Sequence, residues 1–265
     1  MRVEGLNPEH HRHLGLRRER TCRFFAGHLT IPLWPSEVAR ACRSLPIGFV
    51  RERGTLQAVA ITGLRPGENL CIDAAGQWCC DYLPAHVRAH PFRFARRRED
   101  GTTPVLALVV DDDAVIGASG VSAGHREALF TEHDEPGPPT QRAMRLFRQL
   151  MQGYSGDAVL RECERLGLLV PWEIRTDDPA SGRPVHLDGV LRIDESRLNA
   201  LDDADFLALR RHGGLALLYA HLVSVPALSD LRRQLDSRPE RPQDAGAADL
   251  DHVVAGDDDE LFEFY

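Results

Sequence analysis

Two cysteines and two histidines lie close together in the stretch GENLCIDAAGQWCCDYLPAHVRAHPF, residues 67–92. Cys79 and Cys80 are adjacent, and His86 and His90 have the spacing at which two side chains share one face of a helix. Thiolate and imidazole are ligands that zinc accepts, but structural zinc sites usually separate their paired cysteines by two residues. Adjacent residues of a strand, moreover, point to opposite faces. The pattern therefore favours a structural hairpin that leads into a short helix, with a metal site as the alternative.

A second candidate ligand set lies in the C-terminal half of the chain. His186 and Asp188 are two residues apart, so a strand would place both on one face, and His212 or His221 follows downstream. Two histidines and one carboxylate form the ligand triad of non-haem iron oxygenases. This order leaves open a metal-dependent enzyme that holds iron or zinc through His186, Asp188 and His221 and modifies a polypeptide. The alternative is a polar pair on a solvent-facing strand and a hydrogen-bonded core histidine at position 221.

Nucleophile and phosphate-binding motifs fail at single positions. Ser119 follows Gly117 as in a G-x-S-x-G nucleophile elbow, but position 121 is a valine. The chain contains no lysine, which excludes the phosphate-binding loop G-x-x-x-x-G-K-[ST], and no G-x-G-x-x-G follows a strand pattern. Asp111, Asp112 and Asp113 lack the spaced oxygen ligands of a calcium loop. We expect a glycine-rich surface loop and a solvated strand end at these places.

The acidic surplus of the protein is confined to its C-terminal end. Of 40 Asp and Glu and 32 basic residues, ten acidic and two basic residues lie within 234–265, so the remainder is neutral. A neutral body with an acidic end lacks the basic surface that nucleic acid needs. We find no apolar run of the roughly 20 residues that span a membrane, and no secretory signal in MRVEGLNPEHHRH. We therefore expect a cytoplasmic protein with reduced cysteines and no nucleic-acid partner.

Local patterns predict an α+β fold, with a β-rich first half of antiparallel hairpins and a mostly helical second half. PIGFVRERGTLQAVAITGL, residues 46–64, is typical of two strands around a charged turn, and TPVLALVVDDD, residues 103–113, of a buried strand. Beyond the Pro/Gly-rich residues 136–139, apolar residues recur at helical spacing. An acidic cap near residue 202 predicts a helix that breaks at the Gly213-Gly214 pair.

Composition divides the chain into three parts. Residues 1–20 are polar and rich in Arg and His, and we expect a loosely held lead-in. Residues 21–235 carry the patterns of a single domain. Residues 236–265 are rich in Pro, Gly and Asp and predict a disordered acidic tail, which ends in the aromatic letters LFEFY. Disordered segments with aromatic anchor residues can fold when they bind a partner. The tail is therefore a candidate docking segment, and the alternative is a tail that only increases solubility.

Several motifs occur in an order that resembles the bacterial SapC family. They are GLRPGENLCIDAAGQW, DYLPAHVRAHPF, ALFTEHDEPG, LGLLVPWEI, LDGVLRIDESRLNAL and GGLALLYAHLVSV, and the resemblance covers residues 3–233. The family takes its name from a protein associated with a bacterial surface-layer gene cluster. The resemblance implies an accessory role, linked to surface-layer or outer-membrane receptor systems, and implies no particular chemistry. Within residues 67–92 its pattern emphasises Asn69, Trp78, Tyr82, Arg88 and Phe92 rather than the cysteines and histidines.

We therefore expect the protein to act through protein or peptide contacts rather than by catalysis. Asn69, Trp78, Tyr82, Arg88 and Phe92 are the candidate binding residues, because aromatic side chains and arginine dominate recognition surfaces. The competing interpretation is a local aromatic core, since large aromatic side chains are highly buried on average. Two other classes stay open. They are the iron- or zinc-dependent enzyme described above and a surface-layer component that assembles outside the cell.

Overall fold

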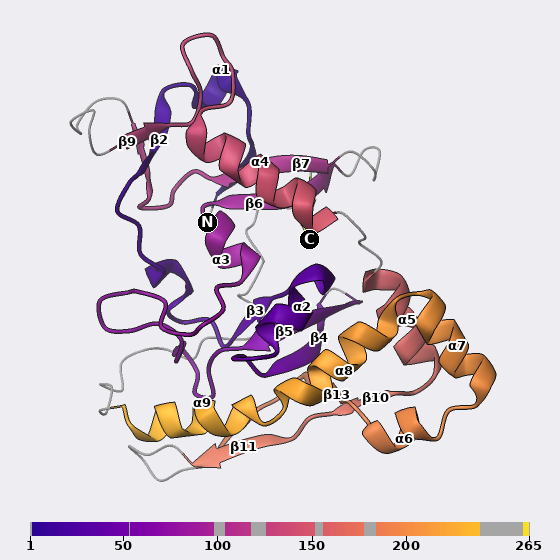
Figure 1. Ribbon diagram of the computed structural model, residues 1–265. Helices are drawn as coiled ribbons and strands as arrows, with labels where there is room; N and C mark the ends of the chain where they lie inside the picture. The colour runs from indigo at the N-terminus through magenta and orange to yellow at the C-terminus, as the bar shows by residue number, and fades with distance from the viewer. Residues whose placement is uncertain are drawn as a thin grey trace. The chain divides into compact units, whose positions relative to one another are not determined.

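The described residues of the computed structural model form two compact units that do not follow sequence order (Figure 1). Unit 1 comprises Met1–Thr21, His86–Gln152 and Val254–Tyr265, and unit 2 comprises Cys22–Ala85 and Gly153–Val253. The sequence predicts that residues 21–235 fold as a single domain, and this stays a prediction. The structure describes residues 2–52, 54–97, 104–117, 126–151, 156–177, 184–238 and 262–264.

Unit 1 is built from antiparallel sheets and short connecting helices. Its strands are β1 (Val3–Gly5), β2 (Leu14–Arg17), β6 (Phe92–Arg97), β7 (Pro104–Val109), β8 (Val115–Gly117), β9 (Arg126–Ala128) and β14 (Phe262–Phe264), and its helices are α1 (Pro8–His11), α3 (Ala85–Ala89) and α4 (Pro138–Met151). One sheet has the strand order β1-β7-β6-β14 and the other the order β8-β2-β9. Sequence neighbours β6 and β7 pair directly, whereas β1 and β14 join their edges from the two ends of the chain.

The helix α4 covers one face of the four-stranded sheet in unit 1. Phe94 of β6 stacks on Phe147 of α4, with ring centroids 4.6 Å apart. Leu16 of β2 is buried in the same unit, and so is His11 of α1. The first 20 residues were expected to be a loosely held lead-in. Instead, the described residues among them form β1, α1 and β2. The buried side chains of His11 and Leu16 hold this segment in unit 1.

Unit 2 combines one five-stranded antiparallel sheet with most of the helices that the structure describes. Its elements are η1 (Arg23–Phe25), β3 (Thr30–Pro32), α2 (Pro35–Ala41), β4 (Ile47–Glu52), β5 (Thr55–Ile61), α5 (Gly156–Arg165), β10 (Leu169–Pro171), β11 (Ile174–Asp177), β12 (Pro184–Leu187), β13 (Val190–Ile193), α6 (Glu195–Asn199), α7 (Asp203–Arg211), α8 (Gly214–Ser224) and α9 (Ala227–Asp236). The sheet has the order β10-β13-β4-β5-β3, and β11 and β12 form a separate hairpin.

The predicted turns and caps of unit 2 are confirmed in detail. Gly54 adopts a φ of 83° where β4 turns into β5, a conformation that a side chain would strain. The Asp202 carboxylate caps α7 by accepting a hydrogen bond from the Asp205 amide at 2.8 Å. Gly213, with φ of 73°, separates α7 from α8 as the sequence predicts.

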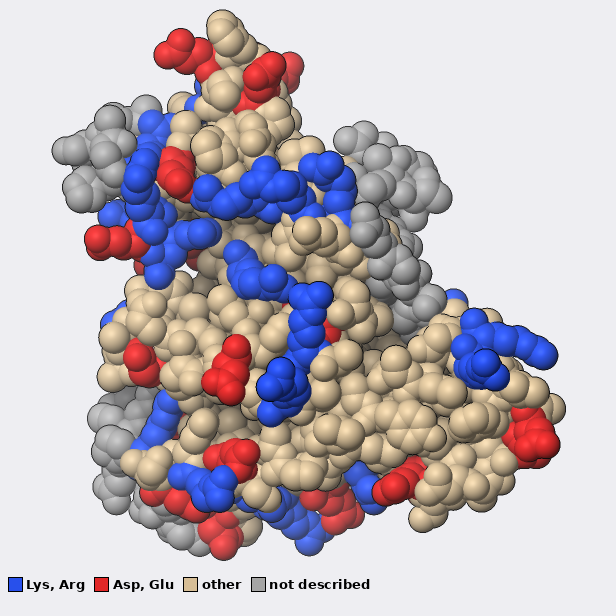
Figure 2. All heavy atoms as spheres, viewed as in Figure 1, with Lys and Arg blue, Asp and Glu red and all other residues tan. Residues whose placement is uncertain are grey.

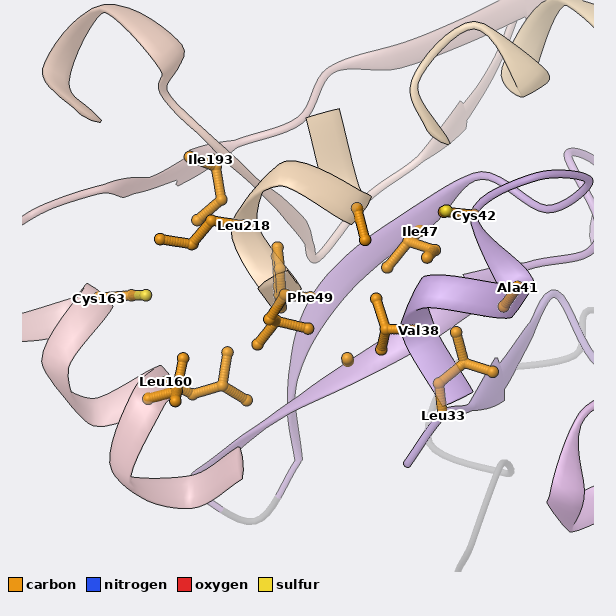
Figure 3. Close-up of a cluster of buried hydrophobic side chains, with 14 of the residues drawn as sticks. Leu33, Val38, Ala41, Cys42, Ile47, Phe49, Leu160, Cys163, Ile193 and Leu218 are labelled. Carbon is orange, nitrogen blue, oxygen red and sulfur yellow. The ribbon is translucent and has the colours of Figure 1, made fainter. Parts of the chain in front are cut away.

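The main core of unit 2 lies around β4. Figure 3 shows side chains from α2, α5 and α8 converging on Ile47 and Phe49, neither of which is exposed to solvent. Such burial stabilises the fold by about 1.5–3 kcal/mol for each large side chain. The predicted α+β class is therefore confirmed, with strands concentrated in the first half of the chain and helices in the second.

Residues 236–265 were expected to form a disordered tail, but those that the structure describes are ordered. Asp236 ends α9, and Arg238 makes four hydrogen bonds within unit 2. Phe262–Phe264 form β14 in unit 1. The intervening residues 239–261 lie outside the described part of the chain.

Candidate functional site

The C-terminal strand β14 occupies an edge of the sheet in unit 1. It pairs antiparallel with β6, with Phe262 opposite Arg97, Glu263 opposite Arg96 and Phe264 opposite Ala95. The other edge of β6 pairs with β7, so β6 has a strand on each side. A strand added at a sheet edge is held mainly by main-chain hydrogen bonds, which any extended peptide can supply. The β6 edge is therefore a place where this fold holds a peptide strand.

The strand β6 is a firm platform because its buried residues anchor it to the core. Phe92 and Phe94 are almost fully buried, and Ala95 is completely buried. Phe92 belongs to a core cluster that includes Leu16 and Leu108. Phe92 thereby anchors the start of β6 to side chains of β2 and β7.

Arginine side chains line the solvent face of the helix that covers β6. Arg142, Arg145 and Arg148 of α4 are all exposed. Figure 2 shows basic side chains gathered along this helix. In the sequence, the four residues 257–260 just before Leu261 and β14 are DDDE. The positive charge on α4 is thus opposite in sign to the negative charge of residues 257–260.

A buried polar cluster lies where β6 begins and β7 ends. The His90 imidazole and the Asp112 carboxylate are 2.7 Å apart, and the backbone carbonyl of His90 accepts a hydrogen bond from Arg20. Burial lowers the pKa of His90, although its contact with Asp112 opposes the shift. Burial and the charge of Arg93 lower the pKa of His86 to about 3, so that histidine is neutral at pH 7. Asp112 therefore has a structural partner in His90, which favours a structural role for this aspartate over cation binding.

The three aspartates have different roles, which corrects the expectation of a solvated strand end. Asp112 is held by His90 and by the Ala114 amide. Asp111 accepts hydrogen bonds from the backbone amide of Arg2 at 3.0 Å, and this contact secures the start of β1. Asp113 is exposed. The candidate nucleophile Ser119 lies outside the described residues.

The cysteine-containing stretch forms the predicted hairpin in unit 2. Ile72 and Trp78 form an antiparallel bridge, and the Cys79 amide donates to the Cys71 carbonyl at 2.8 Å. Gly76 turns the chain with a φ of 82°. Here the turn is closed by the Asp73 carboxylate, which accepts a hydrogen bond from the backbone amide of Gln77.

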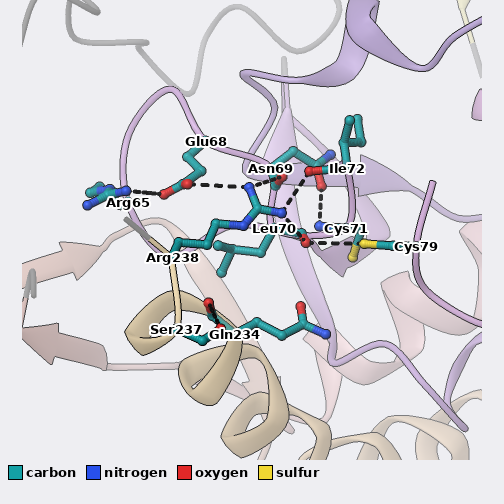
Figure 4. Close-up of polar contacts among 10 residues, drawn as sticks. All are labelled: Arg65, Glu68, Asn69, Leu70, Cys71, Ile72, Cys79, Gln234, Ser237 and Arg238. Atoms are coloured by element: carbon teal, nitrogen blue, oxygen red, sulfur yellow. Dashed lines mark hydrogen bonds and ion pairs between the residues drawn. The ribbon is translucent and has the colours of Figure 1, made fainter. Parts of the chain in front are cut away.

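One distant arginine holds this hairpin in place, as Figure 4 shows. The Arg238 guanidinium donates to the backbone carbonyls of Leu70 and Ile72 at 2.8 and 2.7 Å. It also lies 3.4 Å from the carboxylate of Glu68, which Arg65 contacts at 2.6 Å. A planar guanidinium can satisfy several acceptors at once in this way.

A buried carboxylate organises the segment that follows the hairpin. Glu37 of α2 accepts hydrogen bonds from the Trp34 amide at 3.1 Å, the Tyr82 hydroxyl at 2.7 Å and the Ala85 amide at 2.7 Å. Its residue is only 2% exposed, so these partners replace water. Glu37 therefore ties the segment Tyr82–Ala85 to the N-terminal end of α2 within unit 2.

Three of the predicted binding residues, Asn69, Trp78 and Tyr82, make hydrogen bonds within unit 2. Asn69 is buried and bridges the Phe25 carbonyl and the Cys71 amide, while the Trp78 indole donates to the Tyr82 carbonyl at 2.9 Å. These contacts are structural. The Tyr82 hydroxyl likewise bonds within the fold. The other two candidates belong to unit 1, where Arg88 is exposed and Phe92 lies in the core.

The candidate metal ligands are not brought together. His186 in β12 and Asp188 directly after it are exposed, whereas His221 is fully buried in α8. His221 Nδ1 donates to the Ile47 carbonyl at 2.7 Å, and its Nε2 accepts from the Ile193 amide at 3.1 Å. Neither ring nitrogen has a lone pair left for a metal. In the described part of the chain no group of three or more His, Cys, Asp or Glu residues is arranged to share a metal ion, including the cysteines and histidines of the hairpin stretch.

Acid should destabilise unit 2 through His221. Burial lowers its pKa from 6.5 to about 4, so the unfolded state binds a proton before the folded state does. The free energy of unfolding should therefore fall as pH drops from 6.5 to 4, by about 3 kcal/mol from this group. Urea titrations across this range should show a shallower fall for His221→Gln and an unchanged fall for His186→Gln. Equal slopes in the wild type and His221→Gln would contradict the assignment.

One described helical stretch has the length and composition of a membrane span. Gly214–Asp236 covers 23 residues with a mean hydropathy of 1.4, and half of that apolar window is buried within the fold. Core helices of soluble proteins share these properties. Within it, Ser224 accepts a hydrogen bond from the Ile47 amide and donates to the His221 carbonyl. These contacts tie the stretch to β4, and the absence of a membrane span stays a prediction.

Fold and site together define an α+β protein whose C-terminal strand lies on its own sheet edge. The SapC family model matches residues 6–231, and the chain belongs to the SapC family. No curated protein and no solved structure matches the chain.

Sequence reasoning missed the residues that hold the structure together at a distance. Arg238 lies within the segment expected to be disordered, and its partners are 166–170 residues away. The Glu37 carboxylate likewise binds Tyr82 and Ala85, which are 45 and 48 residues away in the sequence. A usable signal existed only for β14, because the alternating F-E-F pattern is typical of a strand.

Proposed function

We propose that this protein is an accessory binding protein whose β6 edge holds a peptide strand of acidic and aromatic residues. The pairing of β6 with β14 carries the proposal, because that edge already holds such a strand from the same chain. Membership of the SapC family connects this role, as a further part of the proposal, with surface-layer or outer-membrane receptor systems.

The chemistry of the partner follows from the residues around the edge. Main-chain hydrogen bonds provide affinity for any extended strand, and neighbouring side chains provide selectivity. The exposed arginines of α4 favour an acidic segment, and the occupant itself carries an aromatic residue on each side of Glu263. In the backbone register, Glu263 is opposite Arg96.

The C-terminal strand would act as an internal competitor for this edge. Because it is tethered to the same chain, its effective concentration exceeds that of a free peptide. A partner strand must therefore displace β14, or β14 must leave the edge to pair with the partner.

Peptide binding measured by fluorescence anisotropy tests the proposal. A labelled peptide of residues 256–265 should bind a chain that ends at residue 261 more tightly than it binds the full chain, because the shortened chain lacks β14. A peptide with proline at the position of Glu263 should bind weakly, because proline removes a backbone donor from the ladder.

Two controls make the outcome decisive. Urea unfolding should give the shortened chain a cooperative transition, which shows that unit 1 is intact. A scrambled peptide of the same composition separates strand pairing from charge attraction alone. Equal affinity of the peptide for both chains, or no binding to the shortened chain, would contradict a strand-binding edge at β6.

A further inference from the structure

Large apolar side chains that are exposed to solvent gather on one part of unit 2. In the described part of the chain four such side chains are exposed, and three of them, Leu207, Tyr219 and Val223, belong to α7 and α8. Tyr219 is 48% exposed and Val223 is 66% exposed. Figure 2 shows surface without charged side chains over most of α8. Contiguous apolar surface of this kind marks an interaction site, whereas apolar residues scattered singly do not.

The helix α8 is apolar on its outer face as well as on the face that it buries. Leu217 and Leu218 lie in the main core cluster of unit 2. The whole helix, Gly214–Ser224, contains no Asp, Glu, Lys or Arg. The next helix, α9, instead exposes Asp230 and Arg233. Because a helix that is apolar all round is normally buried, we expect the outer face of α8 to be covered by a partner.

The outer face of α8 has the residue spacing that pairs one helix with another. Leu215, Tyr219, Leu222 and Pro226 follow each other at intervals of four, three and four residues. Apolar residues at alternating intervals of three and four form the seam between two packed helices. All four residues are partly or fully exposed, so this seam is open to a partner.

We propose that this seam is the interface of a homodimer, in which the α8 helices of two copies pack antiparallel about a two-fold axis. Two-fold dimers are the commonest assemblies of identical chains. With the axis between Tyr219 and Leu222, Tyr219 of each copy packs against Leu222 of the other, and Leu215 packs against Pro226. The interface lies in unit 2 and uses none of the residues of the β6 edge, so it stands or falls independently of peptide binding.

Charges at the two ends of α8 favour the antiparallel arrangement. Arg211 lies eight residues before Tyr219, Asp230 lies eight residues after Leu222, and both are exposed. Antiparallel pairing brings the Arg211 end of one copy to the Asp230 end of the other, whereas parallel pairing would bring like charges together. The helix dipole acts in the same direction, because the C-terminal end of α8 carries a partial negative charge.

A lipid surface fits this helix less well than a second copy does. Helices that lie in a membrane interface carry a polar face rich in basic residues opposite their apolar face. The other face of α8 instead holds Leu217 and Leu218 in the core of unit 2. The chemistry of the helix therefore favours a protein partner with a matching apolar seam.

Sedimentation velocity of the full chain at increasing concentration tests the proposal. We expect the wild type to pass from monomer to dimer. Tyr219→Lys should raise the Kd of the dimer by more than about 100-fold, because each copy would bury an unpaired charge at the centre of the interface. Val223→Lys is a second variant at a more exposed position, where a basic side chain near the C-terminal end of the helix does not disturb folding. Urea unfolding of both variants checks that they fold.

The matched control is Met144→Lys, which places the same charge on the one exposed large apolar side chain of the described residues that lies outside α7 and α8. This variant should dimerise as the wild type does. A wild type that stays monomeric would overturn the proposal, and its binding to phosphatidylglycerol vesicles would then assign the face to lipid. Folded Tyr219→Lys and Val223→Lys variants that dimerise like the wild type would overturn it as well.

Exchanging the two end charges tests the antiparallel register. Arg211→Asp and Asp230→Arg should each weaken the dimer about tenfold, because each places like charges together at both ends of the seam. The double variant restores opposite charges and should recover the wild-type Kd. A double variant that dimerises no more tightly than the single variants would contradict the antiparallel pairing of α8.

Discussion

Replacing Glu37 with alanine should lower the free energy of unfolding by about 4 kcal/mol, because three hydrogen-bond donors lose a buried acceptor. These donors are the Trp34 amide, the Tyr82 hydroxyl and the Ala85 amide. Tyr82 can turn toward water, but the two amides belong to helix starts and cannot move without unwinding them. Equilibrium unfolding in urea measures the difference.

The contribution of each donor can be separated with milder variants. Tyr82→Phe removes one donor together with its need for an acceptor, so its cost should be only about 1 kcal/mol. Glu132→Ala, at an exposed position after β9, should change stability by less than about 0.5 kcal/mol. A loss for Glu37→Ala no larger than that for Glu132→Ala would show that the carboxylate does not hold the segment Tyr82–Ala85 against α2.

Replacing Arg238 with alanine should destabilise unit 2 by about 3 kcal/mol, since charge-assisted hydrogen bonds are among the stronger ones. The change leaves the carbonyls of Leu70 and Ile72 without their donor and removes one of two cationic neighbours of Glu68. The effect should appear as a lower urea midpoint.

Arg233, in the last turn of α9, provides a control for Arg238. Arg233 has a side chain that is 77% exposed and pairs with Asp230 on the surface, so Arg233→Ala should cost less than about 1 kcal/mol. Arg238→Lys should fall between the two, because an ammonium group cannot reproduce the fork of a guanidinium. Equal effects of Arg233→Ala and Arg238→Ala would mean that Arg238 does not secure the hairpin.

The fold was predictable where the pattern is local. The β4–β5 hairpin, the start of α7 and the break at Gly213 depend on residues within a few positions of each other. The sheet orders were not predictable from such patterns. β13 pairs with β4 across roughly 140 residues, and nothing in either strand specifies the other beyond its apolar face.

The candidate site shows the same division between local and distant contacts. The hairpin within residues 67–92 and its aromatic residues were expected. The partners of the binding candidates could not be read from the sequence, because Tyr82 meets Glu37 and Asn69 meets Phe25 only in the folded chain. For this reason Trp78, Tyr82 and Asn69 looked like recognition residues, while the sheet edge at β6 did not.

Amide hydrogen exchange at β6 tests the strand-binding edge most directly. In the full chain, amides at the Ala95–Arg97 end of β6 should be protected, and a chain ending at residue 261 should lose part of that protection. Adding the peptide of residues 256–265 to the shortened chain should restore it, while amides of β4 and β5 stay unchanged throughout. Peptide binding without renewed protection of β6, or identical exchange in both chains, would contradict a peptide-binding role for this edge.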